Sequence, residues 1–314
     1  MRPVTDFDLV ILGDANPDLI LTGDVVPRFG QAEQVLGAAR LTVGGSGAIT
    51  ACAAARLGLS VALCGVVGDD HFGSFMRDEL GARGVDLAGL DTDSALPTGL
   101  TVVLSRPGDR ASLTHPGTIA ALHAGLVDRD LLRAARHVHV SQYFMQDALR
   151  PDLPALFDEA HASGATTSVD PNADPSGEWD GGLRDLLARV DVFLPNAAEA
   201  LAIAGQTDLD GAARALARLG TTVIVKDGSY GALAARAGYV IRSPAVDGSE
   251  IVDATGAGDC FDAGFITAHL AGESLEQALR VANACGALST RALGGVEAQP
   301  TMQEVLRLLG GPLG

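Results

Sequence analysis

Short apolar runs alternate with helical patterns along most of this chain, and this alternation limits the folds that it can adopt. The runs are short and rich in β-branched residues, which is typical of β-strands. Strands that alternate with helices of about 10–15 residues predict βαβ units and a mostly parallel sheet. Runs that are apolar at nearly every position indicate strands buried on both faces. We therefore expect an α/β fold with a mostly parallel central sheet flanked by helices. The expected strands are 9–12, 61–67, 137–140, 166–169, 192–194 and 222–225, and the expected helices are 46–57, 69–83, 152–163, 181–189, 197–204 and 208–219.

Two segments interrupt this alternation. Residues 17–43 and 97–116 have the pattern of strands and a hairpin with no helix between them, which predicts a small β appendage over one edge of the sheet. After residue 253 the chain becomes helical, and residues 274–277 (SLEQ) resemble a capping box. No internal repeat, low-complexity tract or inter-domain linker is visible, so we expect residues 1–314 to form one domain.

The composition excludes several classes of partner. The formal net charge is −17, from 22 basic and 39 acidic residues, so we expect neither nucleic acid nor an anionic membrane as a partner. No apolar run reaches the length of about 18 residues that a membrane-spanning helix needs, and the first residues lack the parts of a signal peptide. The four cysteines show no CxxC spacing and indicate buried free thiols. We therefore expect a cytoplasmic protein.

Lys226 is the only lysine, and all the other basic residues are arginine. A Walker A loop needs a lysine after its glycines, and a protein kinase needs one in an early strand. Lys226 follows an apolar run late in the chain and suits neither motif. If this protein handles phosphate, it must use backbone amides, arginines or Lys226.

Polar or glycine-rich residues follow five of the expected strands, at 13–18, 141–142, 170–172, 195–196 and 226–228. Ligands of open parallel sheets bind outside the carboxyl ends of the strands. Turns after strands favour Gly, Asn, Asp and Pro in any case, so each position alone could be only a turn. Taken together, the five positions predict a ligand site at this edge of the sheet.

The stretch DATGAGDCFDAGF, residues 253–265, places two glycines and an aspartate at the start of a helical pattern. The first amides of a helix have no intrahelical partners, and the helix dipole favours negative charge there. Glycines let a phosphate approach these amides closely, which makes an anion hole without a cationic side chain. Asp259 could then be the base that deprotonates an attacking hydroxyl. The simpler alternative is that Asp259 only caps the helix.

A second glycine-rich element, VGGSGAI at residues 43–49, precedes another helical pattern. Alone it is weak evidence, because small residues at a helix start also serve close packing. Together, GGSGAITACAAARLGLSVALCGVVGDDHFG and the later DATGAGDCFDAGF resemble the two signatures of the ribokinase-like (PfkB) carbohydrate kinase family. The resemblance extends from GDANPD near the start to NACGALSTRALGG near the end. It implies a mostly parallel sheet flanked by helices, a small β lid formed by residues 17–43 and 97–116, and transfer of the γ-phosphoryl group of ATP to a sugar-like hydroxyl.

The resemblance implies roles for the catalytic and substrate-binding residues. Asp259 matches the family's catalytic base, and the anion hole corresponds to Gly256, Ala257 and Gly258. Asp18 matches the aspartate that binds substrate hydroxyls, and Asn16 matches the asparagine that ribokinases carry in the same motif. Gly45 and Ser46, in the first glycine motif, correspond to the sugar pocket.

The resemblance also implies ATP and Mg²⁺ as cofactors. Asn196 and Glu199 match the NxxE element associated with magnesium and phosphates, with Glu199 as the metal residue. The loop bordering the nucleotide corresponds to Lys226, Gly228 and Gly231, and Asn283 falls where the helix that closes the adenine pocket is expected to begin. Taken alone, Asn196 and Glu199 could be a helix-starting turn and a surface acid, and Lys226 could be a solvated strand end. Family members often hold a monovalent cation near the anion hole, so a K⁺ site stays open.

Ser46 and Ile49 depart from the pattern of ribokinases, which carry a lysine and an asparagine at these places. The loss of two polar sugar contacts weakens the case for free ribose and admits a keto-hexose, a deoxy sugar acid or a nucleoside. We expect an ATP-dependent kinase of a small sugar, with a homodimer formed through the lid segments. The alternatives are a nucleoside kinase and a non-catalytic sugar- or nucleotide-sensing protein on the same fold. A dinucleotide-dependent oxidoreductase is disfavoured, because the turn after the first strand lacks GxGxxG.

Overall fold

The strands of the central sheet point their side chains alternately into two helical layers. In β1 (Phe7–Leu12), Leu9 and Ile11 pack into one core, whereas Val10 and Leu12 pack into the other. This alternation follows from the two-residue period of a strand, and it explains why the run is apolar at consecutive positions. The structure is a computed structural model, and it describes residues 7–31, 33–106, 109–246 and 251–311.

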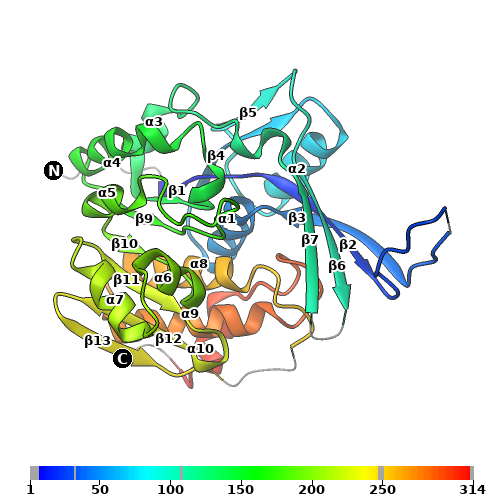
Figure 1. Ribbon diagram of the computed structural model, residues 1–314. Helices are drawn as coiled ribbons and strands as arrows, with labels where there is room; N and C mark the ends of the chain where they lie inside the picture. The colour runs from blue at the N-terminus through cyan, green and yellow to red at the C-terminus, as the bar shows by residue number, and fades with distance from the viewer. Residues whose placement is uncertain (1–6, 32, 107–108, 247–250, 312–314) are drawn as a thin grey trace.

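Within the described residues, the central sheet has nine strands in the order β13-β12-β11-β10-β9-β8-β1-β4-β5 (Figure 1). All pairings from β11 to β5 are parallel, whereas β12 and β13 extend one edge as an antiparallel hairpin. In this register Leu9 of β1 lies between Val61 and His137. The other strands are β4 (Val61–Gly68), β5 (Leu90–Asp93), β8 (Ala135–Val140), β9 (Thr166–Val169), β10 (Val192–Phe193), β11 (Thr222–Lys226), β12 (Ala232–Arg236) and β13 (Tyr239–Ser243).

Helices cover both faces of this sheet (Figure 1). One core lies between the sheet and α1 (Ser46–Leu57), α2 (His71–Ala82), α8 (Ala257–Leu270), α9 (Leu275–Ser289) and α10 (Met302–Leu308). The other core lies beneath α3 (Arg129–Ala134), α4 (Leu153–Ala162), α5 (Leu183–Leu186), α6 (Ala197–Ala204) and α7 (Leu209–Ala217). Short 3₁₀ turns lie in the connections: η1 (Gly117–Ala120), η2 (Tyr143–Met145), η3 (Arg150–Asp152), η4 (Leu187–Arg189) and η5 (Gly228–Tyr230).

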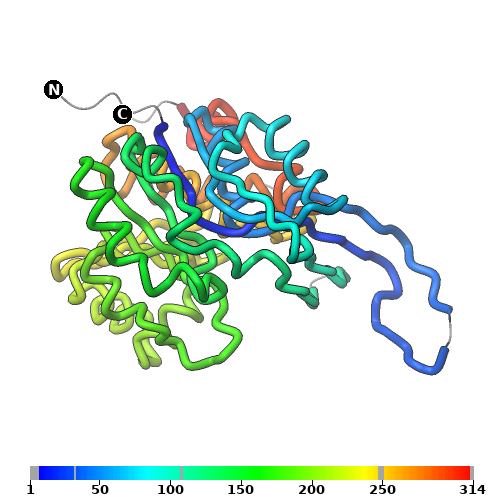
Figure 2. Tube along the Cα trace, turned by 90° about the horizontal axis from the view of Figure 1, so that it is seen from above, coloured from blue at the N-terminus to red at the C-terminus, as the bar shows by residue number. Residues whose placement is uncertain are grey.

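A second sheet of four strands stands beside the central one, in the order β3-β2-β6-β7 (Figure 1). Its strands are β2 (Asn16–Thr22), β3 (Ala38–Gly44), β6 (Leu100–Arg106) and β7 (Asp109–His115). They come from the two segments that interrupt the alternation of strands and helices. Asp18 lies opposite Thr42 and Thr101 in this sheet. Between β2 and β3, residues 23–31 and 33–37 extend away from the body of the molecule (Figure 2).

The predicted fold class is confirmed, and the structure corrects some of the predicted elements. The antiparallel hairpin of β12 and β13 was not predicted from the sequence. The helix expected at 181–189 is wrong in part, because Gly181 and Gly182 adopt φ values of 51° and 82°. Such values cannot continue a right-handed helix, so α5 begins only at Leu183 and gives way to η4.

The predicted capping box at the start of α9 is confirmed. Gln277 N donates to Ser274 Oγ at 3.3 Å, and Ser274 N donates to Gln277 Oε1 at 3.2 Å. This exchange satisfies two of the amides that a helix start leaves without partners. Within the described ranges, no helix combines the length and the apolar character needed to cross a membrane.

Gly264 places α8 in close contact with α9. A Cβ at this position would lie 2.7 Å from Cys285 Sγ and 3.1 Å from Ala282 Cα, so one helix would have to move. We predict that Gly264→Ala lowers the free energy of unfolding by about 1–3 kcal/mol, the usual effect of overpacking a core. Urea denaturation measures this change.

Gly81 of α2 provides the matched control. The nearest atom to a Cβ at Gly81 is Leu87 Cδ1 at 3.8 Å, which is ordinary contact. Gly81→Ala should therefore leave stability unchanged or raise it by up to about 1 kcal/mol through helix propensity. Equal effects of the two substitutions would contradict the close packing of α8 on α9.

Candidate active site

Lys226 joins the carboxyl ends of the parallel strands to the first turns of α8. Its Nζ donates to Asp170 Oδ2, just after β9, at 2.9 Å and to Asp262 Oδ2, in α8, at 2.9 Å. The Lys226 side chain is only 12% exposed, so the alternative that it is a solvated strand end is wrong. The predicted set of polar strand ends therefore converges on the helix that begins within DATGAGD.

Lys226, Asp170 and Asp262 shift one another's pKa values. Burial alone would lower the pKa of Lys226, but Asp170 and Asp262 raise it, so the ammonium stays charged. Burial would raise the pKa of Asp170, yet the positive charge of Lys226 lowers it. Burial, together with the negative charge of Asp170, raises the pKa of Asp262 well above its usual range. Lys226 therefore lies between two buried carboxyl groups whose pKa values are shifted in opposite directions.

Asp259 lies in the first turn of α8, and its carboxylate bonds across to α1. Ser46 Oγ donates to Asp259 Oδ1, and Asn172 Nδ2 donates to Ser46 Oγ at 3.0 Å. In the part of the chain that the structure describes, Asp259 accepts no hydrogen bond from the amides of its own helix. Asp259 therefore does not cap α8 through a hydrogen bond, whereas its place in the first turn suits the helix dipole, and the capping alternative stays open to test.

The electrostatic environment of Asp259 suits proton transfer. Burial raises the pKa of Asp259 to about 7, and the charge of Asp170 adds to this shift. The hydrogen bond from Ser46 and the charge of Lys226 act in the opposite direction. A carboxyl group with a pKa near neutrality can accept a proton and release it again at physiological pH.

The backbone amides at the start of α8 are free to bind an anion. Among the described residues, the N–H groups of Gly256, Gly258 and Asp259 have no hydrogen-bond acceptor. Ala257, also expected in the anion hole, differs because its N–H donates to Ala254 O at 3.3 Å. Three unpaired amides at the positive end of a helix dipole form a ready anion site.

Gly44 and Gly45 make room for the polar side chains of the GDANPD segment. A Cβ at Gly44 would lie 2.0 Å from Asp18 Oδ1. A Cβ at Gly45, whose φ is 79°, would lie 2.9 Å from both Asn16 Oδ1 and Asp14 Oδ2. The bare backbone of the first glycine motif therefore lets these three side chains gather beside α1.

Asn16 and Asp18 are buried with hydrogen-bonding capacity to spare. They are 2% and 6% exposed, and Asn16 Oδ1 has no partner within the residues that the structure covers. Burial, with the charges of Asp14 and Asp253, raises the pKa of Asp18 to about 7, which Arg110 partly offsets. Buried polar atoms without partners are costly, so this pair indicates a place for ligand hydroxyls.

Asp14 positions Ser46 at the start of α1. Its Oδ2 accepts from Ser46 N at 3.1 Å, and its Oδ1 accepts from Gly47 N at 2.9 Å. This bonding orients the first turn of α1, and with it the Ser46 hydroxyl that bonds Asp259. Ile49, one turn further along, packs behind the anion hole, because a Cβ on Gly256 would lie 3.0 Å from its Cγ2.

A pocket of about 590 Å³ opens beside the first turn of α8. This volume lies within the range of about 300–1,000 Å³ that is usual for small-ligand sites. The pocket is lined by most of the residues predicted to contact nucleotide and phosphate: Lys226, Gly228, Gly231, Ala257, Gly258 and Asn283. Its remaining walls are mostly small or apolar: Ser229, Ala245, Val246, Ile251, Ala254, Phe261, Gly286, Ala287 and Thr290.

Asn283 lies in the middle of α9, so the expectation that it marks the start of this helix is wrong. The helix begins at Leu275, because Ser274 provides the cap. Asn283 Nδ2 donates to Ser243 Oγ at 3.1 Å and to Pro244 O at 3.2 Å. These bonds hold the end of β13 against α9 and so shape one wall of the pocket.

Asn196 and Glu199 form a capping box at the start of α6. Glu199 N donates to Asn196 Oδ1 at 2.9 Å, and Asn196 N donates to Glu199 Oε2 at 2.8 Å. The alternative of a helix-starting turn is therefore right for Asn196, but Glu199 is buried and is not a surface acid. Burial and the charge of Asp170 raise the pKa of Glu199 to about 7.

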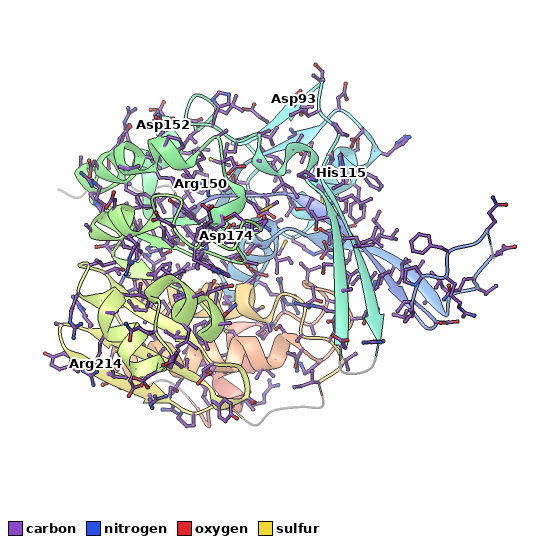
Figure 3. All side chains as sticks on the ribbon, viewed as in Figure 1. Asp93, His115, Arg150, Asp152, Asp174 and Arg214 are labelled. Carbon is purple, nitrogen blue, oxygen red and sulfur yellow. The ribbon has the colours of Figure 1, made fainter. Side chains whose placement is uncertain are left out.

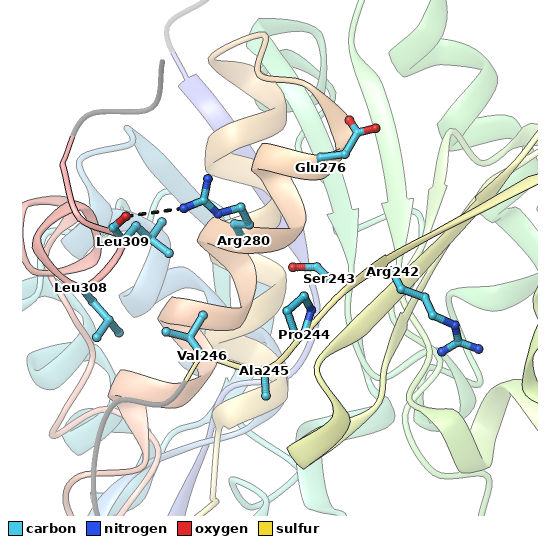
Figure 4. A pocket seen from close by; sticks show the side chains of 9 residues that line it. All are labelled: Arg242, Ser243, Pro244, Ala245, Val246, Glu276, Arg280, Leu308 and Leu309. Carbon is cyan, nitrogen blue, oxygen red and sulfur yellow. Dashed lines mark hydrogen bonds between the residues drawn. The ribbon is translucent and has the colours of Figure 1, made fainter.

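A second hollow, of about 410 Å³, shares Ala245 and Val246 with this pocket (Figure 4). Its two arginines are engaged, since Arg280 Nη2 donates to Leu309 O at 3.5 Å and Arg242 pairs with Asp210. None of its lining residues belongs to the cluster around Asp259. The candidate active site is therefore the region around DATGAGD.

Several residues of this site were not singled out by the sequence. Asp14 and Asn172 stand among the polar strand ends, which indicate a position but not a contact. Asp262 stands three residues after Asp259 in α8, and helical spacing could have placed both on one face. No sequence pattern indicated that Arg110, in β7, would lie at this site.

The raised pKa of Asp18 fixes the direction in which pH changes stability. The folded state binds the proton of Asp18 more tightly than the unfolded chain does, where the pKa is about 4. This contribution to stability is full below that value and is lost as the pH rises through about 7. Asp18→Asn should therefore raise the melting temperature at about pH 8 and flatten its decline from about pH 5.5.

Asp152→Asn is the control for this pH series. Asp152 is an exposed carboxylate (Figure 3), and its replacement should leave the pH slope of the melting temperature as it is in the unaltered protein. An Asp18→Asn variant with the same slope as the unaltered protein would show that Asp18 does not carry a raised pKa.

Known proteins resemble this chain over nearly its whole length. The sequence profile described as pfkB family carbohydrate kinase matches residues 6–302. An ATP-dependent ribose-1-phosphate kinase of Halopiger xanaduensis is 34% identical over 305 residues, which covers 95% of this chain and 96% of that protein. A 2-dehydro-3-deoxygluconokinase of Bacillus subtilis is 30% identical over 276 residues, which covers 82% of this chain and 84% of that protein.

Solved structures agree with the sequence comparison. The ribokinase of Arabidopsis thaliana complexed with ribose and ATP has a TM-score of 0.85 at 25% identity, and the match covers 98% of this chain and 99% of that one. An E. coli protein in complex with ATP and Mg²⁺ has a TM-score of 0.84 at 25% identity, covering 96% and 99%. The protein therefore belongs to the pfkB family of carbohydrate kinases, and it is an enzyme of the sugar and nucleoside kinase class.

Proposed function

We propose that this protein transfers the γ-phosphoryl group of ATP to a hydroxyl group of a small sugar. The observation that carries this proposal is the position of Asp259, a partly buried carboxyl with a pKa of about 7, beside free amides at the start of α8. The carboxyl can accept a proton, and the amides can stabilise negative charge next to it. Phosphoryl transfer to a hydroxyl needs both functions at one place.

Asp259 is the proposed general base. The Ser46 hydroxyl donates to its Oδ1, while Oδ2 has no hydrogen-bond partner among the described residues. The free Oδ2 can accept the proton of the attacking hydroxyl, and Ser46 holds the carboxylate in place as it does so. Asn172 and Asp14 fix Ser46 in turn, through bonds of 3.0 Å and 3.1 Å.

Asn16 and Asp18 are the proposed contacts to the acceptor. The unpaired Oδ1 of Asn16 and the carboxylate of Asp18 can each accept a hydroxyl hydrogen bond. Gly45 gives them space, and Ser46 connects this side of the site to the base. A polyhydroxylated acceptor satisfies these buried acceptors, which is why we favour a sugar. A nucleoside is the alternative, and an ADP-release screen with ribose, fructose and adenosine would distinguish the two.

The free amides of Gly256 and Gly258 are the proposed phosphate contacts. When bound, ATP supplies the phosphoryl group and Mg²⁺ neutralises part of its charge. The pocket lined by Lys226, Gly228 and Gly231 fits a nucleotide in size. Asn196 and Glu199 are the proposed residues toward Mg²⁺, which commonly binds through one or two carboxylates, phosphate oxygens and water. A K⁺ site stays a prediction, and turnover with and without K⁺ would test it.

The small sheet of β2, β3, β6 and β7 is the proposed lid. Asn16 and Asp18 belong to β2, so movement of this sheet would change access to the acceptor. Closure would exclude water from the site, which protects phosphoryl transfer from hydrolysis. Val26, Phe29 and Val35, beyond β2, are exposed, which supports the proposal of a homodimer through this sheet. Light scattering would measure the molar mass.

We predict that Asp259→Asn lowers kcat by about 10²- to 10⁴-fold, the usual contribution of a general base. Asparagine keeps the size and the contact with Ser46 but cannot accept the proton. Stability should stay the same or rise, because a costly buried charge is removed. The measurements are kcat from coupled ADP release and the melting temperature, with Asp152→Asn as the control. Near-normal turnover would show that Asp259 is not the base.

Gly258→Ala tests the anion hole separately. A Cβ at Gly258 would lie 3.7 Å from Lys226 Nζ, so the folded protein has room for the methyl group. The methyl would keep a phosphate away from the free amides, and kcat/KM for ATP should fall by up to about 10²–10³-fold. Gly81→Ala is the matched control, and its kcat/KM should not change. An unaffected Gly258→Ala enzyme would place the phosphate elsewhere.

A further inference from the structure

Arg110 reaches from the small sheet to the loop that carries the anion hole. Figure 3 shows His115, the last residue of β7, at one end of this strand. Arg110 stands at the opposite end of the strand. Its Nη1 donates to Thr255 Oγ1 at 2.5 Å, and Thr255 directly precedes Gly256. A positive charge from the lid therefore stands beside the phosphate-binding turn.

Arg110 is not needed to satisfy the acid beside it. Asp253 Oδ1 accepts from Thr255 N at 3.0 Å and from Thr255 Oγ1 at 2.8 Å, while its Oδ2 accepts from Gly294 N at 2.9 Å. Arg110 Nη1 lies 3.9 Å from Asp253 Oδ1, which is beyond hydrogen-bond distance. The Thr255 hydroxyl donates a hydrogen bond to Asp253 and therefore accepts the hydrogen bond from Arg110.

The guanidinium of Arg110 keeps unused donors. Its side chain is 46% exposed, and among the described residues its Nε and Nη2 have no hydrogen-bond partner. These N–H groups form the planar fork that binds a carboxylate or a phosphate through two parallel bonds. The same charge acts on Asp18, the proposed sugar contact. Arg110 therefore lies between the proposed acceptor site and the anion hole.

The acceptor side of the site otherwise repels anions. Its titratable groups are the carboxyls of Asp14, Asp18, Asp253 and Asp259. Arg40, from β3, is engaged by Glu297 at 2.9 Å. The first glycine motif offers the hydroxyl of Ser46 and no cation. Arg110 differs from Arg40 because, among the described residues, no carboxylate lies within hydrogen-bond distance of its guanidinium, the nearest being Asp253 Oδ1 at 3.9 Å.

We propose that the acceptor of this kinase is a sugar that carries an anionic group, a phosphate ester or a carboxylate, and that Arg110 binds this group. This inference rests on the proposed function. A neutral sugar satisfies Asn16 and Asp18 but leaves the fork of Arg110 empty. An anionic sugar satisfies all three, because its hydroxyls bind Asn16 and Asp18 while its anionic group forms charge-assisted hydrogen bonds with Arg110.

The test compares acceptors and variants in one kinetic series. The anionic probes are ribose 1-phosphate and 2-dehydro-3-deoxygluconate, and the neutral probes are ribose and fructose. The unaltered enzyme should have a kcat/KM at least about tenfold higher for one anionic probe than for either neutral probe, because charge-assisted bonds discriminate by this order. The preferred anionic probe identifies the group as a phosphate or a carboxylate.

Arg110→Gln should lower kcat/KM for the preferred anionic probe by about 10- to 100-fold, mainly through KM. Its kcat/KM for ribose and fructose should not fall. Arg110→Lys should recover part of the loss, since it restores the charge but not the planar fork. Arg106→Gln is the matched control, because Arg106 pairs with Asp109 at the same end of this hairpin. This control should keep the full preference.

Two results would overturn the proposal. One is a preference of the unaltered enzyme for ribose or fructose. The other is an equal fall of kcat for all acceptors in Arg110→Gln, which would place Arg110 on the transferred phosphoryl group. Failure of the proposed function is distinguishable, because it gives no turnover with any probe. In that case, calorimetric binding of ribose 1-phosphate that is lost in Arg110→Gln would still support the anion site, and unchanged binding would overturn it.

Discussion

The ion pairs of Lys226 with Asp170 and Asp262 connect the strand ends to α8, and the arrangement of the whole site depends on them. Two carboxyls this close together cannot both be charged without a cation between them. The ammonium of Lys226 lies there, and a Cβ on Gly258 would lie only 3.7 Å from it. The same group therefore balances the buried acids and adds positive potential beneath the free amides. Removing it would leave uncompensated buried charge, which is strongly destabilising.

The two glycine motifs begin two helices, and these helices differ in whether the protein supplies acceptors for their first amides. At α1 the protein supplies its own anion, because Asp14 accepts hydrogen bonds from Ser46 N and Gly47 N. At α8 the amides of Gly256, Gly258 and Asp259 have no acceptor among the described residues. The first amides of α1 are thus already paired, which holds Ser46 in place, whereas those of α8 are free to bind a ligand. The hydrogen bond from Ser46 to Asp259 joins the N-terminus of α1 to that of α8.

Much of this architecture could be predicted from local patterns. The alternation of runs predicted a mostly parallel sheet, which the pairings from β11 to β5 confirm, although neither the strand order nor β5 was predicted. DATGAGD predicted the start of α8 to within a residue. The roles expected of Asp259 and Asp18 stay proposals, which the bond from Ser46 to Asp259 and the burial of Asp18 support. Asn283 was misplaced within its helix, since the capping box at Ser274 sets the helix start. Arg110 could not be predicted, because its partner Thr255 lies far away in the sequence.

The sequence by itself determined the layers, the two glycine-rich helix starts and the family. These features depend on local periodicity, backbone freedom and short motifs, and each of these can be recognised within a short stretch of sequence. The tertiary structure alone decided which charges meet. Lys226 and Asp170 are separated by 56 residues, and Ser46 and Asp259 by 213. Pairings over such distances depend on the packing of whole elements, and burial then sets the pKa of each carboxyl. The raised pKa of Asp259 therefore follows from the fold as much as from the motif.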